Sequence, residues 1–203
     1  MEKKISFIGA GKVGTSLAYL LKRKGYDVFG IASRTINSAQ KAYEFIGDIT
    51  YSNDIYMFIE DSDVVFITTN DDAILTVING IKENCEIKEG QIFIHTSGSI
   101  SAEVFKPLED LGALGISIHP LQTIANPQEG IKNIIGSLFA IDGNEKAFEF
   151  AKQVVDDLEG EPFFIESEKK PLYHLSAVIA CNYFVTLMNK SVNLFKKVNI
   201  DEK

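Results

Sequence analysis

The stretch Gly9-Ala10-Gly11-Lys12-Val13-Gly14 decides the fold, because it joins a short apolar run, Lys4–Ile8, to a helical pattern over Thr15–Lys24. A G-x-G-x-x-G motif between a strand and a helix is typical of dinucleotide-binding sheets. The first glycine forms a tight turn, the second lets the backbone approach a pyrophosphate, and the third allows close helix–strand packing. We therefore expect residues 9–14 to bind dinucleotide phosphates at the helix N-terminus, the alternative being a glycine-rich turn without a ligand.

Apolar runs and helical patterns continue to alternate after this motif. The expected strands are 4–8, 26–32, 49–51, 64–68, 91–95, 114–119, 137–141 and 162–165, and the expected helices between them are 15–24, 37–46, 72–83, 102–111 and 145–158. Asp142 and Glu145 have the spacing of a capping box at the start of the last of these helices. The alternation predicts an α/β fold with a doubly wound, mostly parallel Rossmann sheet.

A different pattern follows Pro171. Residues 172–198 contain no glycine or proline, which predicts one helix of roughly 40 Å at about 1.5 Å per residue. Such a helix is too long to be a crossover of the sheet. We expect a dinucleotide-binding Rossmann domain at residues 1–167 and the start of a C-terminal helical domain at residues 168–203. One helix cannot bury its own apolar face, so either a partner subunit covers it or the chain is a truncated form of a longer protein.

Composition and charge disfavour several classes of protein. The 203 residues are 45% hydrophobic and carry a net charge of −8, which argues against a general binder of nucleic acid or anionic membranes. Cys85 and Cys181 do not form a C-x-x-C pair, so neither a metal site nor a disulfide framework is expected. No signal peptide is visible, and Leu175–Met188 reads as too short and too polar to span a bilayer. We expect a cytoplasmic protein.

The end of the second expected strand predicts the cofactor. An NAD enzyme usually has Asp or Glu at this position, whereas this chain has Ser33, Arg34 and Thr35. A guanidinium flanked by two hydroxyl groups suits the 2′-phosphate of NADP. The alternative is a solvated loop arginine whose neighbours cap the next helix. We expect NADP rather than NAD.

Small uncharged polar residues follow three further strands. Thr69 and Asn70 follow the fourth strand, Ser97 follows the fifth, and the run 119–123 follows the sixth. Ligands of open α/β sheets bind at the carboxyl ends of the strands, so these groups suit a nicotinamide ribose and a polar substrate. Ordinary turn chemistry explains each segment singly about as well.

Three histidines and one asparagine are candidates for the chemistry. His95 lies in a buried strand and is expected to be a hydrogen-bonded core residue. His119 at a strand end and His174 in the first turn of the long helix could each donate a proton during hydride transfer. Asn182 begins a polar face with Thr186, Asn189 and Asn193, which either faces a cleft or is a wet or interhelical face. The predicted catalytic residues are His119, His174 and Asn182.

The motif order resembles a known bacterial family. GAGKVG (9–14), ASRT (32–35), SGS (97–99), HPLQT (119–123) and KKPLYHLSAVIACNYFV (169–185) together are similar to Rossmann-like proteins joined to a helical domain of unknown function. That family resembles the 6-phosphogluconate dehydrogenase superfamily, which includes pyrroline-5-carboxylate reductase and the β-hydroxyacid dehydrogenases. The resemblance covers nearly the whole chain and implies an NADP-dependent oxidoreductase.

The chain departs from this pattern in two ways. The β-hydroxyacid dehydrogenases use a Lys and an Asn one turn apart, but Val178 stands four residues before Asn182. Asn182 can keep the asparagine role, while His119, His174 and Lys170 remain alternatives for the proton donor. The family's helical domain also continues well beyond this point.

The leading expectation for function is hydride transfer between NADP and a small carbonyl, imine or hydroxyacid. A non-catalytic NADP(H)-binding sensor or regulatory protein is the alternative, and an interaction module built on the long helix is a third. The resemblance implies a homodimer through the C-terminal helical region. We expect a small-molecule substrate, and the acidic composition argues against nucleic acid or a membrane as a partner.

Overall fold

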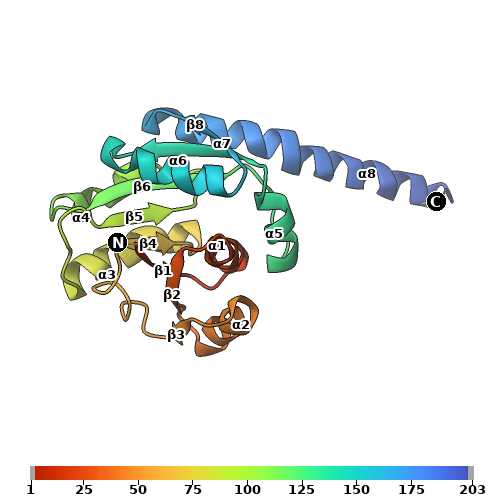
Figure 1. The fold of residues 1–203 in the computed structure, drawn as a ribbon. Helices are drawn as coiled ribbons and strands as arrows, with labels where there is room; N and C mark the ends of the chain where they lie inside the picture. Colours follow the sequence, from red (N-terminus) through yellow and green to blue (C-terminus); the bar gives the residue numbers. More distant parts are fainter. Residues whose placement is uncertain (1–2, 201–203) are drawn as a thin grey trace.

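An eight-stranded sheet with the order β3-β2-β1-β4-β5-β6-β7-β8 forms the centre of the molecule (Figure 1). The computed structural model describes residues 3–200. All neighbouring strands are parallel except β6 and β7, which are antiparallel. The strands are β1 (Lys4–Ile8), β2 (Asp27–Ala32), β3 (Thr50–Ser52), β4 (Val64–Ile67), β5 (Ile92–His95), β6 (Leu114–Pro120), β7 (Leu138–Gly143) and β8 (Glu161–Phe164).

Helices cover both faces of the sheet, as a doubly wound fold requires. They are α1 (Lys12–Arg23), α2 (Ile36–Ile46), α3 (Asp71–Asn84), α4 (Lys106–Glu109), α5 (Pro127–Ile134) and α6 (Phe148–Asp157), followed by α7 (Lys170–Val178) and α8 (Phe184–Lys197). Short 3-10 turns precede α4 (Ala102–Phe105), α6 (Glu145–Ala147) and α7 (Ser167–Lys169), and a π-helical turn (Ile179–Tyr183) joins α7 to α8.

The core consists of one apolar layer on each face of the sheet. Alternate side chains of β1 and β4 enter opposite layers, so that Phe7 and Phe66 stack at 4.7 Å between ring centroids while Ile8 and Ile67 face the other way. The first layer packs under α1, α2 and α6, and the second packs under α3 and α4. The continuous apolar runs of these strands follow from burial on both faces.

The expected strands agree with the structure to within about two residues at each end, and the predicted fold class is confirmed. Two expectations about local structure are wrong. No helix was expected at α5, where Asn126 caps the first turn by accepting a bond from the Glu129 amide. Asp142 does not cap a helix: it lies within β7, and Asn144 is the N-cap of the turn that follows. The carboxylate of Asp142 has different partners, described below.

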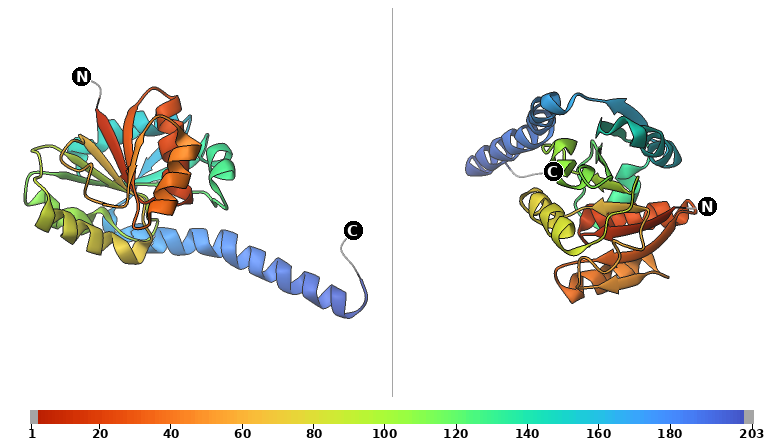
Figure 2. Two further views of the ribbon diagram at one scale, coloured as in Figure 1. Left: turned by 90° about the horizontal axis from the view of Figure 1, so that it is seen from below. Right: turned by 90° about the vertical axis from the view of Figure 1, so that its left-hand side faces the viewer.

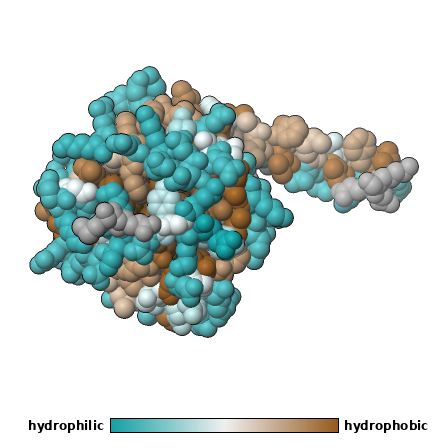
Figure 3. All heavy atoms as spheres, viewed as in Figure 1, coloured by the Kyte–Doolittle hydropathy of each residue, from teal (hydrophilic) through white to brown (hydrophobic). Residues whose placement is uncertain are grey.

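The C-terminal helix projects beyond the sheet in every view (Figures 1 and 2). Its far end is exposed, with Leu187 and Leu194 at 65% and 64% exposure, and apolar side chains continue along the projecting part (Figure 3). Helical turns run without a break from Ser167 to Lys197, and this whole segment is long and apolar enough to cross a membrane by length and composition alone. The sequence had indicated instead that its most apolar part, Leu175–Met188, is too short and too polar to span a bilayer.

The helix is attached to the sheet by a buried ion pair. The Nζ atom of Lys170 lies 2.6 Å from Oδ1 of Asp142 and also bonds the hydroxyl of Ser117, and the side chains of Lys170 and Asp142 are fully buried. The other carboxylate oxygen accepts bonds from the Ala102 amide at 2.8 Å and the Ser167 hydroxyl at 3.1 Å. This cluster joins β6, β7 and the start of α7, so it fixes the direction in which the helix leaves the sheet.

We expect Lys170→Met to lower the free energy of unfolding by about 3–5 kcal/mol, because it leaves the Asp142 carboxylate buried without its cation. The neighbouring Lys169→Met should change it little, because the ion pair between Lys169 and Glu166 is exposed. Urea unfolding of both variants beside the unchanged protein measures the difference. Equal losses in the two variants would contradict this account of the pair.

Candidate functional site

A first cavity lies where the strand order reverses, at the carboxyl ends of β1 and β4. It has a volume of about 600 Å³ and is formed by the loop after β1, the end of β2 and the start of α3. In open α/β sheets this switch point is where nucleotides bind. Its lining includes Gly9, Ala10, Gly11, Ser33, Arg34, Thr35, Ser38, Thr68, Thr69 and Asn70. Lys12, Val13 and Gly14 form the first turn of α1.

The three glycines of the motif have different surroundings. Gly9 has a φ of +112°, and a Cβ atom there would lie 2.7 Å from the Thr68 carbonyl carbon. A Cβ atom on Gly14 would overlap the Gly9 carbonyl oxygen and the Thr68 hydroxyl. Beside Gly11 there is open space. The backbone is therefore packed tightly at positions 9 and 14 and is open to a ligand at position 11.

Unsatisfied polar groups in the first cavity fit a dinucleotide. No side chain caps the N-terminus of α1, so its first amides are free to bind an anion. The Thr69 hydroxyl is buried without a hydrogen-bond partner in the described part of the chain. Arg34 is exposed at the rim beside Ser33 and Thr35. These groups suit phosphates at the loop, a ribose near Thr69 and a further anion at Arg34.

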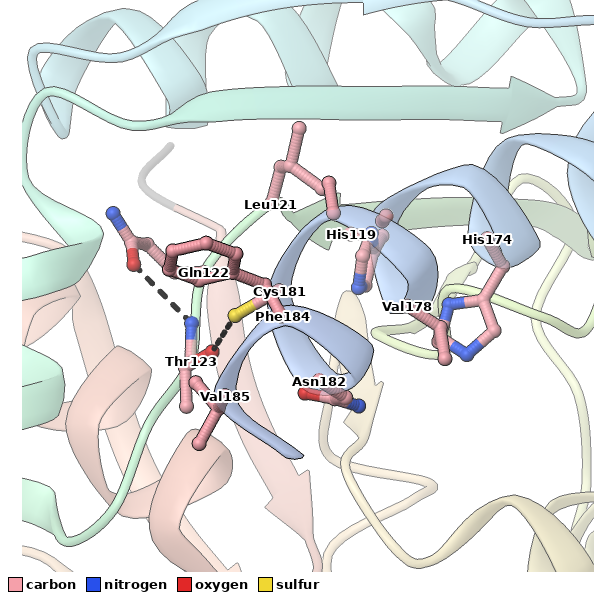
Figure 4. Close-up of a pocket in the computed structure, with 12 residues that line it drawn as sticks. His119, Leu121, Gln122, Thr123, His174, Val178, Cys181, Asn182, Phe184 and Val185 are labelled. Carbon is pink, nitrogen blue, oxygen red and sulfur yellow. Dashed lines mark hydrogen bonds between the residues drawn. The ribbon is translucent and has the colours of Figure 1, made fainter. Parts of the chain in front are cut away.

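The second cavity, of about 420 Å³, lies between the end of β6 and the long helix (Figure 4). His119 enters it from β6, while His174 and Asn182 enter it from the helix. Asn182 belongs to the π-helical turn, a feature that is frequent at functional sites. The remaining lining is mostly apolar: Leu121, Gln122, Thr123, Ala177, Val178, Ala180, Cys181, Phe184 and Val185.

Side chains from three separate motifs meet beside this cavity. The Nδ1 atom of His119 lies 3.0 Å from the Tyr173 hydroxyl, and the rings of His119 and His174 are 6.1 Å apart. A Cβ atom on Gly98 would lie 2.6 Å from Nδ1 of His174 and 2.7 Å from Nε2 of His119. Only a glycine at this position leaves room for both rings, and the two nitrogens face the same backbone segment.

Burial favours the uncharged forms of His119 and Tyr173. Burial, helped by the positive charge of Lys170, lowers the pKa of His119 from 6.5 to about 4. Asp71 opposes this shift. Burial also raises the pKa of Tyr173 to about 12. At neutral pH the pair is therefore a neutral imidazole and a neutral phenol. The Nδ1 atom of His174 is buried and has no hydrogen-bond partner among residues 3–200.

Most of the predicted site residues line one of these two cavities, but Lys12, Val13 and Gly14 of α1 are outside both linings. Ser97 lines neither: its hydroxyl accepts the amides of Ser99 and Ile100, and Ser99 in turn bonds Asp71. His95 is fully buried in the core, as expected, and its ring lies within bonding distance of the Ser101 carbonyl and the Ser97 amide. Of the polar helix face, only Asn182 lines a cavity, while Thr186, Asn189 and Asn193 are exposed.

Three features of the site were not recognised in the sequence. Tyr173 stands beside His174 in the segment LYH, but a tyrosine on a helix gives no sign of its partner. The space beside Gly98 is filled by His119 and His174, two residues that are distant from it in the sequence. Lys170, considered as a proton donor, is fully buried against Asp142 and does not line the second cavity. In the described residues, no cluster of His, Cys, Asp or Glu is arranged for a metal ion.

Comparisons with known proteins agree with this geometry. Residues 2–120 match the family of the Rossmann-like domain, and residues 137–203 match the domain of unknown function DUF2520. No curated protein sequence matched the chain. A crystal structure from Bacteroides fragilis, named provisionally as an NADP oxidoreductase, is 26% identical with a TM-score of 0.81, over 98% of this chain and 74% of that one.

Two further solved structures share the fold. A protein of Thermotoga maritima is 30% identical, with a TM-score of 0.73 over 98% of this chain and 71% of that one. A 3-hydroxyisobutyrate dehydrogenase of Salmonella typhimurium is 13% identical, with a TM-score of 0.79 over 98% of this chain and 69% of that one. These matches include the long helix, so it is part of a soluble Rossmann-fold protein and not a membrane span.

The chain therefore belongs to the family that joins a Rossmann-like domain to a DUF2520 domain, and it shares its fold with 3-hydroxyisobutyrate dehydrogenase.

Proposed function

We propose that this chain binds NADP in the first cavity and transfers hydride to or from a small carbonyl, imine or hydroxyacid in the second. The observation that supports this most directly is the pairing of the two cavities. A glycine-rich loop at the switch point and a second cavity that holds His119 and His174 both lie at the carboxyl ends of the parallel strands. The Bacteroides relative, whose name includes NADP, supports the same class of reaction.

The preference for NADP over NAD rests on Arg34. Its guanidinium stands at the end of β2, the position at which an acidic residue would hold the ribose of NAD. Ser33, Thr35 and Ser38 line the same rim and add hydroxyl groups, with Thr35 donating to Ser38 at 2.8 Å. The rim offers one cation and several hydroxyl groups, which is the donor set that a 2′-phosphate needs.

Arg34→Ala should remove most of the preference for NADPH. We expect NADPH to bind about ten- to a hundredfold more tightly than NADH to the unchanged protein, and the variant to bind both with similar affinity. Fluorescence titration with each cofactor measures the ratio. Arg23→Ala, at the far end of α1, is the matched control, since these are the two arginines of the chain. Equal titration curves for the unchanged protein would refute the NADP assignment.

In the second cavity, His119 is the group best placed to serve the reacting atom. When bound, NADP supplies the hydride chemistry. The chain must then provide a proton donor or a hydrogen bond for the substrate oxygen or nitrogen. His119 offers Nε2 beside the cavity, and its neutral ring donates a hydrogen bond without adding a charge to an apolar site. Asn182 adds an amide that can orient a polar substrate.

The pH dependence should report the lowered pKa of His119. If turnover needs the neutral ring, kcat/KM for carbonyl reduction should stay nearly constant from about pH 8 to pH 5 and fall as the pH approaches 4. His119→Gln should lose at least about a hundredfold in kcat, together with this acid limb, while NADPH affinity changes little. Rates across the pH range test both. A break near pH 6.5 would show an imidazole with an ordinary pKa instead.

We also propose a cytoplasmic homodimer formed through the C-terminal helical region. In this proposal the Rossmann domain spans residues 1–167 and the helical region begins at residue 168. Residues 1–2 and 201–203 of these units lie outside the described part of the chain. The exposed apolar face of α8 supports this, because leaving several such side chains in water is unfavourable by about 1.5–3 kcal/mol each. A twofold contact would bring each helix against its copy or the partner's sheet.

Sedimentation should therefore show a dimer at micromolar concentration. Leu187→Glu combined with Leu194→Glu should shift the protein to a monomer, because both side chains lie on one face of α8, seven residues apart. Asn189→Glu, on the opposite face, should leave the dimer intact and is the control. A monomeric unchanged protein that keeps its full helicity by circular dichroism would show that the helix needs no partner.

A further inference from the structure

The ring of Tyr173 packs against the rings of His119 and Phe163, and its hydroxyl lies within hydrogen-bonding distance of His119. The tyrosine and His119 rings meet edge to face, with centroids 5.8 Å apart at 81°. The tyrosine ring also packs against Phe163, with ring centroids 5.7 Å apart at 70°. The 3.0 Å contact with Nδ1 of His119 is the only hydrogen bond of this hydroxyl within the described residues. The side chain is therefore oriented by β6 and β8 together.

The surroundings decide which atom donates in this hydrogen bond. The phenol keeps its proton at neutral pH and needs an acceptor, and the neutral ring of His119 offers an unprotonated nitrogen. If Nδ1 carried the proton instead, the phenol proton would have no acceptor among residues 3–200. The arrangement that gives the phenol proton an acceptor has Tyr173 donating to Nδ1, which leaves the ring proton on Nε2.

The Nε2 atom points away from Tyr173, toward the segment at Gly98 that also faces Nδ1 of His174. Among the described residues it has no hydrogen-bond partner, although His119 lines the second cavity. A proton fixed on Nε2 is therefore available to a substrate atom placed in that cavity.

Resting on the function proposed above, we propose that Tyr173 is a positioning residue that holds His119 as its Nε2–H tautomer and replaces the proton that the ring gives to the substrate. In carbonyl reduction the carbon gains hydride from the nicotinamide cofactor and the C=O π bond breaks. The oxygen takes the proton from Nε2, and Nδ1 takes the phenol proton. His119 stays neutral throughout, and the phenolate of the partly buried Tyr173 regains a proton from solvent.

The tautomer can be measured without substrate or cofactor. Two-bond ¹H–¹⁵N correlation spectra of the full chain distinguish the protonated from the unprotonated nitrogen of each imidazole. The His119→Gln variant identifies the His119 signals among those of the three histidines. We expect a single Nε2–H tautomer in the unchanged protein at pH 7.5 and a mixture of both tautomers in Tyr173→Phe. An Nδ1–H tautomer in the unchanged protein, or a tautomer that Tyr173→Phe does not alter, would overturn the inference.

Kinetics supply the second readout. Tyr173→Phe should lower kcat for carbonyl reduction at least about tenfold with little change in KM, because the proton path is lost while the ring and its packing remain. Tyr183→Phe, an exposed tyrosine further along the same helix, is the matched control and should keep full activity. An unaltered kcat in Tyr173→Phe would overturn the inference. If the unchanged protein reduces no carbonyl or imine, the proposed function fails, and the NMR result still decides the tautomer.

Discussion

The buried contact of Lys170 with Asp142 and Ser117 is the constraint on which the geometry of the second cavity depends. A lysine ammonium leaves water only when its charge is paired and its hydrogen-bonding capacity is used, and this one has a carboxylate and a hydroxyl. The pair lies at the first turn of α7, so it sets both the position and the direction of the helix. Tyr173 and His174 follow within one turn, so their distances from His119 depend on this attachment.

The same pair also affects the electrostatics of the cavity. Lys170 brings a positive charge close to His95 and His119, and this charge acts with burial to lower the pKa of both rings. A neutral imidazole is a hydrogen-bond donor and acceptor at once, whereas an imidazolium only donates. The ion pair of Lys170 with Asp142 thus attaches the helix to the sheet and also favours the neutral ring of His119, which can both donate and accept a hydrogen bond.

The sequence predicted most of the fold because its patterns are local. The runs of Val, Ile and Phe in β1, β4 and β5 are buried on both faces, and the motif at residues 9–14, when it follows a strand, is typical of a dinucleotide-binding sheet. Asp142 shows where local reasoning fails. Its spacing to Glu145 matched a capping box, but Lys170, 28 residues later in the chain, is a stronger partner for its carboxylate. Helix α5 was missed because its start at Pro127 lies in a segment rich in turn-forming residues.

The candidate site was predictable only as separate pieces. The sequence analysis noted the segments HPLQT, SGS and LYH separately. Their spacing did not predict that His119, Gly98 and His174 lie next to one another in the fold. Position along a strand predicts the edge at which a side chain lies, and not the neighbour it meets there. The bond between Tyr173 and His119 joins residues 54 positions apart and depends on the path of a helix whose attachment, at Lys170, was itself not foreseen.

The exposed helix α8 and the second cavity share residues. Phe184 and Val185 begin α8, and they also line the cavity. The partner surface proposed to cover the apolar face of α8 would therefore border the cavity as well, and it would exclude water from the place where a substrate would meet His119. Excluding water strengthens the hydrogen bonds inside such a site, because competing solvent is removed. The same contact on the apolar face of α8 would thus bury the helix and shield the reacting atoms from water.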